Sequence, residues 1–126
     1  IRSFYDRADR VYRTTYPGSV NVNTTYNGQG LPETLATSSV TFVEGANYNA
    51  LGQPEKVLLG NSGLDLQMEW SYYSDSQRLK WLLAGESTNR TKWLRQMITY
   101  DDAGNVTLAY SIGALLLSTI VAAPSE

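Results

Sequence analysis

The sequence of 126 residues contains no cysteine and no histidine. Without cysteine the chain forms no disulfide, and thiolate chemistry, Cys-ligated zinc and iron–sulfur sites are excluded. The lack of histidine removes the commonest general base, the commonest metal ligand and every Ser–His or Cys–His dyad. We therefore expect no metal and no cofactor. An enzyme of this composition would have only Asp, Glu, Tyr, Lys and Arg as catalytic residues. This restricted set favours the interpretation that the protein is not an enzyme.

Strong charge and long apolar stretches are also missing. Lys and Arg number 10 against 12 Asp and Glu, and the net charge of −2 is too small to indicate nucleic acid or an acidic partner. The only long apolar run, residues 112–123, is about half of the ~20 residues that a membrane-spanning helix needs, so no membrane span is expected. The chain begins at Ile1 without an initiator Met or a signal-peptide pattern, and we interpret it as a single-domain segment of something longer.

What the sequence does contain is a short pattern that returns five times. Each copy begins with a tyrosine, and successive tyrosines stand 21, 22, 25 and 27 residues apart: Tyr5, Tyr26, Tyr48, Tyr73 and Tyr100. The next residue is short and polar, a type that hydrogen-bonds the local backbone in turns: Asp6, Asn27, Asn49, Ser74 and Asp101. The fourth residue after the tyrosine is typical of a position held at positive φ: Asp9, Gly30, Gly52, Gln77 and Gly104. Each copy therefore predicts a strand, a tight turn and a second strand, which is a β-hairpin.

The segments between these turns favour strands. Alternating or β-branched residues occupy 12–16, 20–26, 40–43, 56–59 and 66–72, and Pro17-Gly18 marks a further turn. Residues 78–84 and 90–100 repeat the string Lys-Trp-Leu on either side of a polar loop, which predicts a hairpin that joins them. In total we expect about eight to eleven strands. The predicted fold is all-β, with repeated antiparallel β-hairpins in a twisted sheet that closes as a small barrel or sandwich, or closes by oligomerisation.

The pattern ends near residue 108, which divides the chain into a repeat domain, 1–108, and an apolar tail, 109–126. The tail could be a buried strand, a short helix or a contact between subunits, and periodicity alone does not decide between them. Its β-branched residues 119–121 favour a strand, and we expect the tail to lie in an interface.

The repeated strings resemble the YD repeats of the Rhs family, whose consensus approximates Y-D-x-x-G-R-(V/L) followed by a Thr/Tyr-rich strand. The matching positions are Tyr5-Asp6 with Arg10-Val11, Tyr26-Asn27 with Gly30-Leu31, Tyr48-Asn49 with Gly52-Gln53, Arg78-Leu79, and Tyr100-Asp101 with Gly104-Asn105. They extend from residue 4 to about residue 108, and five copies in register are far more specific than one.

The resemblance implies hairpins stacked into a spiralling antiparallel sheet that forms a hollow shell, as in bacterial polymorphic toxins, insecticidal toxin complexes and teneurin-like surface proteins. In that family the shell encloses a toxic C-terminal domain or supports adhesion, and the repeats are not the effector. The expected partners are the rest of a longer repeat shell or further copies of the chain, and the expected location is secreted or at the surface of a bacterium. The tail matches neither the repeat nor the Asp-Pro-rich autocleavage segment of such shells, so no cleavage residues follow from the resemblance.

Candidate chemistry in the turns is less distinct than the architecture. The motif tyrosines could form an aromatic ladder for a sugar or a peptide, but their recurrence in every copy favours packing beside the turn. The motif Asp and Asn residues could be acids or metal ligands, but their fixed place favours hydrogen bonds to the turn backbone. Asp101-Asp102 is the best carboxylate pair, although neighbouring strand residues point to opposite faces.

One segment, residues 78–95, carries five basic residues against one acid, Glu86, with two interleaved tryptophans. This composition is typical either of a platform that binds a glycan or a polyanion or of a solvated sheet face whose long side chains cover the tryptophans. The candidate binding residues are Arg78, Lys80, Trp81, Arg90, Lys92, Trp93 and Arg95.

Three functions remain open. The leading hypothesis is a structural YD-repeat module of an encapsulating or cell-surface β-shell with no chemistry of its own. The first alternative is a glycan- or polyanion-binding β module that uses the Trp81/Trp93 basic face. The second alternative is a minimal hydrolase without His or Cys, whose site forms in a homo-oligomer.

Overall fold

The computed structural model describes residues 1–60, 66–86 and 93–113 of the chain. The chain divides into two compact units, Ile1–Asp65 and Leu66–Glu126. The described residues form ten strands and no helix, which confirms the all-β prediction and the expected number of strands. Because no described residue is helical, none belongs to a helical membrane span. The candidate residues Arg90 and Lys92, and nearly all of the apolar run 112–123, lie outside the described residues.

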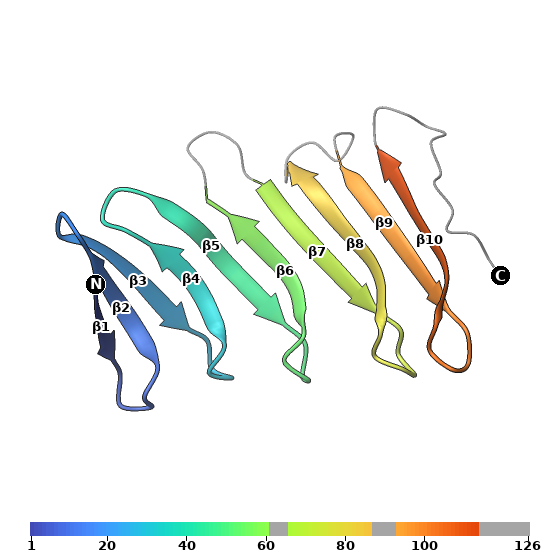
Figure 1. Ribbon diagram of the computed structural model, residues 1–126, viewed down its shortest axis with the longest axis horizontal. Helices are drawn as coiled ribbons and strands as arrows, with labels where there is room; N and C mark the ends of the chain where they lie inside the picture. Colours follow the sequence, from blue (N-terminus) through green and yellow to red (C-terminus); the bar gives the residue numbers. More distant parts are fainter. Residues whose placement is uncertain (61–65, 87–92, 114–126) are drawn as a thin grey trace. The chain divides into compact units, whose positions relative to one another are not determined.

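The first unit is an antiparallel meander of six strands that lie side by side in chain order (Figure 1): β1 Arg2–Tyr5, β2 Val11–Tyr16, β3 Val20–Tyr26, β4 Pro32–Ala36, β5 Thr41–Tyr48 and β6 Pro54–Leu59. Each strand pairs with the next one. Three of the connections are copies of the repeated pattern, and we call them tyrosine turns: residues 6–10, 27–31 and 49–53. Between β2 and β3, where the sequence predicts a turn, Gly18 and Ser19 have φ angles of 80° and 61°.

The second unit is a meander of four strands: β7 Leu66–Tyr72, β8 Leu79–Glu86, β9 Leu94–Tyr100 and β10 Val106–Gly113. Tyrosine turns of residues 73–78 and 101–105 connect β7 to β8 and β9 to β10. Strands β8 and β9 pair with Leu83 opposite Arg95, which confirms the hairpin predicted from the repeated Lys-Trp-Leu strings.

The two faces of the first sheet differ in polarity. One face carries cross-strand hydrogen bonds between polar side chains: Arg13 Nε to Asn23 Oδ1 at 3.0 Å, Thr15 Oγ1 to Asn21 Oδ1 at 2.6 Å, and the hydroxyls of Thr25 and Thr34 at 2.6 Å. The opposite face carries apolar or partly apolar pairs: Thr14 with Val22, Tyr16 with Val20, Thr24 with Leu35, and Leu35 with Val43. This alternation along each strand is the pattern that the sequence predicts for 12–16 and 20–26.

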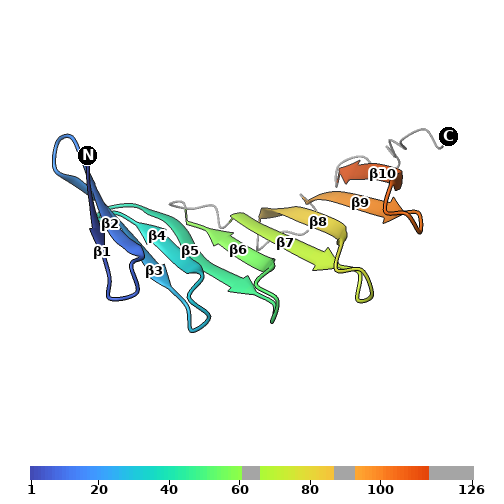
Figure 2. The ribbon, with the colours of Figure 1, turned by 60° about the horizontal axis from the view of Figure 1, so that its bottom comes forward.

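Neither sheet closes, so the predicted barrel or sandwich is wrong for both units. In each unit the strand order follows the chain, and the first and last strands do not pair with each other. Figure 2 shows the strands of each unit as a single layer. A closed barrel needs an interior filled by large side chains. Among the described residues only Ala46, Gln67 and Trp93 are buried, and no side chain is fully buried. Closure by oligomerisation stays a prediction.

Candidate functional site

The first turn shows how the residue after the tyrosine builds a tyrosine turn. The backbone N–H of Asp6 donates to the carbonyl of Arg10 at 2.9 Å, and the N–H of Asp9 donates to the carbonyl of Asp6 at 3.1 Å. The Asp6 carboxylate then accepts the N–H groups of Ala8 and Arg10 at 2.8 and 3.0 Å. One short side chain therefore closes the loop from inside, which is the role that the sequence predicts.

The same bonds recur in the second and third turns, where an amide replaces the carboxylate. Asn27 Oδ1 accepts two backbone N–H groups of its turn at 2.9 and 3.0 Å, and Asn49 Oδ1 does the same at the same distances. In the fifth turn Asp101 Oδ1 accepts the N–H of Asn105 at 2.8 Å. Because Asp and Asn share only the acceptor oxygen, these turns use that oxygen and need no ionised carboxylate.

The fourth residue after each tyrosine adopts the left-handed conformation that the sequence predicts. The φ angles are 60° at Asp9, 79° at Gly30 and Gly52, 58° at Gln77 and 88° at Gly104. Two copies therefore hold a residue with a Cβ in a conformation that glycine adopts at lower cost.

The fourth turn departs from the others by one residue. Strand β7 ends at Tyr72, which pairs with Leu79, and six residues lie between them instead of five. The N–H of Tyr73 donates to the carbonyl of Arg78 at 2.9 Å, and the residue directly after Tyr73 is Ser74 in place of the Asp or Asn of the other copies. The turn therefore begins one residue earlier than the alignment on Tyr73 implies.

The motif tyrosines bond each turn to the hairpin before it. The hydroxyl of Tyr26 donates to the carbonyl of Val11 at 2.7 Å, and that of Tyr48 donates to Pro32 at 2.6 Å. In the second unit the hydroxyl of Tyr100 donates to Leu79 at 3.0 Å. Each acceptor is the sixth residue after the preceding motif tyrosine, where the strand resumes. Tyr73 differs again, because its hydroxyl donates forward to Ile98 of β9 at 3.0 Å.

A second contact joins consecutive turns through the fifth residue after the tyrosine. The guanidinium of Arg10 lies 4.4 Å above the ring of Tyr26. Its Nη1 atom stands 3.4 Å from the place where a Cβ on Gly30 would be, and Leu31 Cδ1 lies 3.5 Å from the equivalent place on Gly52. Arg78 repeats the arrangement over the ring of Tyr100 at 5.5 Å, and a Cβ on Gly104 would overlap its guanidinium.

The turn carboxylates are held in their ionised form. The side-chain hydrogen bond from Arg10, at 2.8 Å, and then the Arg10 backbone N–H lower the pKa of Asp6, and an ion pair of 2.7 Å joins the two side chains. At Asp101 the side-chain hydrogen bond from Asn105, at 3.0 Å, is the main cause of a lowered pKa. Both shifts follow from bonds to the charged form, so these acids are suited to a structural role and not to proton transfer near neutral pH.

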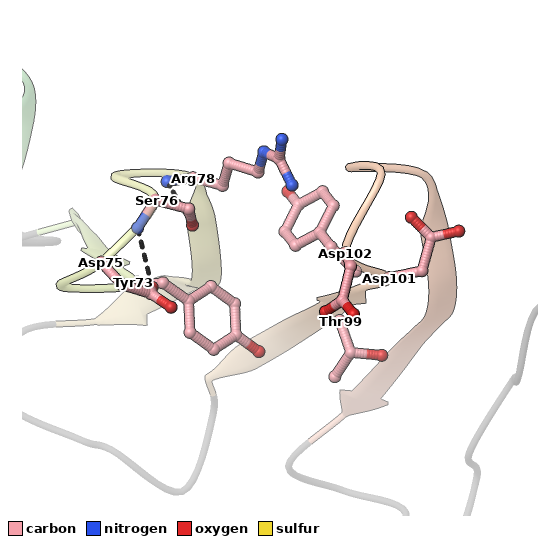
Figure 3. A pocket seen from close by; sticks show the side chains of 8 residues that line it. Tyr73, Asp75, Ser76, Arg78, Thr99, Asp101 and Asp102 are labelled. Carbon is pink, nitrogen blue, oxygen red and sulfur yellow. Dashed lines mark hydrogen bonds between the residues drawn. The ribbon is translucent and has the colours of Figure 1, made fainter.

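A hollow of about 380 Å³ lies between the fourth and fifth turns (Figure 3). Its lining consists of Tyr73, Asp75, Ser76, Arg78, Thr99, Tyr100, Asp101 and Asp102. Arg78 ends its turn as Arg10 does, but Tyr73 stands where Asp6 would be, because its N–H donates to the Arg78 carbonyl. Within the described residues the Arg78 guanidinium has no carboxylate partner. The described residues contain no group of three Asp or Glu side chains that could hold a metal ion.

The structure separates the candidate binding residues into two groups. Trp81 and Arg95 lie on one face of the β8–β9 hairpin, and Trp93 packs on that face against Gly85. Trp93 is only 6% exposed, and its indole N–H donates to the carbonyl of Glu86 at 2.6 Å. Arg78 and Lys80 instead contact the tyrosine rings of the turns, with the Lys80 ammonium 5.5 Å from the Tyr73 ring. Ligand binding by these residues stays a prediction.

Sequence reasoning missed the contacts between consecutive turns. The signal was present in the sequence, because Arg10, Leu31 and Arg78 hold one position of the repeat, and a glycine follows in the next copy. Nothing within a single copy indicates that its tyrosine bonds a carbonyl about 15 to 21 residues earlier.

No protein-family model and no curated protein matches the chain. Solved structures do match. The crystal structure of TcdB2-TccC3-Cdc42 aligns at 21% identity with a TM-score of 0.77 over 88% of this chain, and that of TcdB2-TccC3 at 21% identity with a TM-score of 0.76 over the same share. The chain has the fold of a stretch of these YD-repeat chains.

At this identity the likeness concerns the fold alone. The crystal structure of TcdB2-TccC3 without the hypervariable C-terminal region gives the same result, with 20% identity and a TM-score of 0.76 over 86% of the chain. The matched chains are toxin-complex shell proteins with YD repeats, which confirms the resemblance stated for the tyrosine pattern. The chain spans only 5% of the length of each of these chains.

Proposed function

We propose that the chain is a structural module of a longer YD-repeat shell that encloses or displays another protein segment, with no chemistry of its own. The observation that carries the proposal is the bonding between consecutive repeats. The hydroxyls of Tyr26, Tyr48 and Tyr100 are each occupied by a carbonyl of the preceding hairpin. The residues that recur most regularly are thereby used for architecture.

The scarcity of buried side chains supports the same proposal. An open, single-layer sheet has unpaired edge strands and little core, and such sheets gain stability from adjoining repeats. In the described residues only three side chains are buried, so contacts along the row of hairpins must supply much of the stability. The likeness to chains of which this one would be 5% supports a role as one part of a larger shell. A secreted or cell-surface location in a bacterium is part of the proposal.

The proposal is tested by extending the chain with its flanking coding sequence and imaging the product by electron microscopy. We expect a hollow shell, and we expect a segment inside it to resist a protease that cleaves the same segment when it is expressed alone. An extended protein that shows no enclosed volume and gives no protection would contradict the proposal.

We propose as a second candidate function that the basic residues at the fourth turn bind a polyanion such as an acidic glycan. The favouring observation is Arg78, which is exposed, fixed on the ring of Tyr100 and without a carboxylate partner among the described residues. Lys80 adds a second positive charge close to the same turn. A guanidinium already held in place loses little freedom when it binds an anion.

This candidate is tested on immobilised heparin with two variants of equal net charge. Replacing Arg78 and Lys80 with alanine should lower the salt concentration at which the protein elutes. Replacing Arg2 and Arg7, which lie in the first unit, should leave elution close to that of the wild type. Equal shifts for both double variants would show non-specific charge attraction and would remove the candidate.

A further inference from the structure

The edge of the first sheet at β1 leaves one motif tyrosine unused. Tyr5 is 58% exposed, and within the described residues its hydroxyl has no hydrogen-bond partner. Strand β1 lies at the end of the strand order and pairs only with β2 in the described part of the chain. In the later copies, Tyr26 and Tyr48 stand beside a preceding hairpin and donate to its carbonyl at 2.7 and 2.6 Å. Tyr5 therefore presents the donor of an inter-repeat bond without its acceptor.

Asp9 is a second unused group at the same edge. It occupies the fourth position after the tyrosine, where the next two copies have glycine, and its φ angle is 60°. At Gly30 and Gly52 the side chain of the fifth residue of the preceding turn lies 3.4 and 3.5 Å from the place of a Cβ. A preceding turn would therefore direct its own fifth residue at the Asp9 side chain. Within the described residues the Asp9 carboxylate has no ion pair.

We propose that the β1 edge docks a further tyrosine-turn hairpin whose fifth residue is arginine or lysine. The carbonyl of its sixth residue accepts the Tyr5 hydroxyl, and its basic side chain pairs with the Asp9 carboxylate. The inference rests on the proposed function, because the partner is a repeat of the same kind. It adds specificity: a hairpin like the first copy, with Arg10, fits this edge, whereas one like the second copy, with Leu31, leaves Asp9 without a partner.

The test places a second copy of residues 1–21 ahead of Ile1 in the full chain. This spacing sets the added tyrosine 21 residues before Tyr5, as Tyr5 stands before Tyr26, and it supplies arginine at the fifth position. Hydrogen exchange of the amides in β1 to β3, read by mass spectrometry, gives the opening equilibrium of this part of the sheet. We expect the added hairpin to slow exchange in β1.

Tyr5→Phe should then raise the opening equilibrium constant about fivefold in the extended protein, as expected for one lost hydrogen bond, and should change nothing in the original chain. Tyr26→Phe is the matched control and should raise it in both proteins. Asp9→Asn keeps a residue that tolerates positive φ and removes the charge. Asp9→Asn should raise the opening equilibrium constant about twofold to threefold in the extended protein and leave it unchanged in the original chain. The effect should disappear when the added fifth residue is leucine in place of arginine.

Two outcomes separate this inference from the function on which it rests. If the added hairpin leaves exchange in β1 unchanged, repeats do not stack on this edge and the proposed shell module fails as well. If the hairpin slows exchange but Tyr5→Phe and Asp9→Asn have equal effects in the original and extended proteins, stacking holds and the inference about Tyr5 and Asp9 is overturned.

Discussion

Replacement of Gly104 by alanine tests whether the contact between consecutive turns forms in solution. Gly104 has a φ angle of 88°, and a Cβ at this position would overlap the guanidinium of Arg78. The substitution therefore does two things. It forces an L-residue into the left-handed region, and it drives Arg78 off the ring of Tyr100, above which it lies at 5.5 Å.

The two effects have different expected sizes. The left-handed conformation costs an L-residue about 1–2 kcal/mol. Loss of an exposed cation–π contact costs about 0.5–1 kcal/mol. We expect Gly104→Ala to lower the free energy of unfolding of the second unit by about 1.5–3 kcal/mol as the sum of these terms. In an Arg78→Ala background only the conformational part, about 1–2 kcal/mol, should remain.

Urea denaturation followed by tryptophan fluorescence measures these changes. Trp70, Trp81 and Trp93 all lie in the second unit, so the signal reports on the unit that carries the substitution. The four proteins of the double-mutant cycle share the same reporters, and the coupling energy between positions 78 and 104 is the decisive quantity. If Gly104→Ala lowers the free energy of unfolding equally with and without Arg78, the packing of the guanidinium on Gly104 is refuted.

Further expected outcomes concern single groups. Tyr26→Phe removes the hydroxyl bonded to Val11 and should destabilise the first sheet by about 1 kcal/mol, as measured by hydrogen exchange in β2 and β3. Tyr16→Phe is the control and should leave this exchange unchanged. Equal effects of the two substitutions would contradict the tyrosine bond. Because the pKa of Asp101 is lowered below 3.8, its contribution is complete above that value and is lost as the pH falls through the lowered pKa. Asp101→Asn should reduce this acid-side loss in a pH titration of fluorescence, and an unchanged titration would assign the loss to other groups. Trp93→Phe should lower the free energy of unfolding in urea by about 1–3 kcal/mol, because the smaller ring fills less of the buried site and the hydrogen bond of the indole N–H is lost. An unchanged free energy of unfolding would place Trp93 at the surface.

The turns could be predicted from the sequence because their chemistry is local. The bonds that Asp6, Asn27 and Asn49 accept all lie within four residues along the chain. The positive φ at Gly30 and Gly52 is likewise a property of the turn itself. A pattern of short polar residue and glycine at fixed spacing is therefore sufficient to locate the turns, and alternation is sufficient to locate the strands.

Two features of the candidate site depended on pairing between distant residues. The doublet Tyr72-Tyr73 gives two possible strand ends, and only the pairing of Tyr72 with Leu79 shows where the fourth turn begins. Trp93 follows a basic residue in the sequence, as Trp81 does, and only the neighbouring Gly85 allows it to be buried. Neither outcome can be predicted from a single copy of the repeat.

The sequence by itself determined the all-β class, the approximate places of the five turns and, in four of them, the residue that closes the turn, since each turn is stabilised by contacts within a few residues. Tertiary structure alone decided that the sheets stay open, that tyrosine hydroxyls bond the preceding hairpin, and that Arg10 and Arg78 cover the next turn. The physical reason is that these contacts join residues far apart in the sequence. These features depend on which residues lie opposite one another across strands, and that register is set by the assembled sheet and not by the local chain.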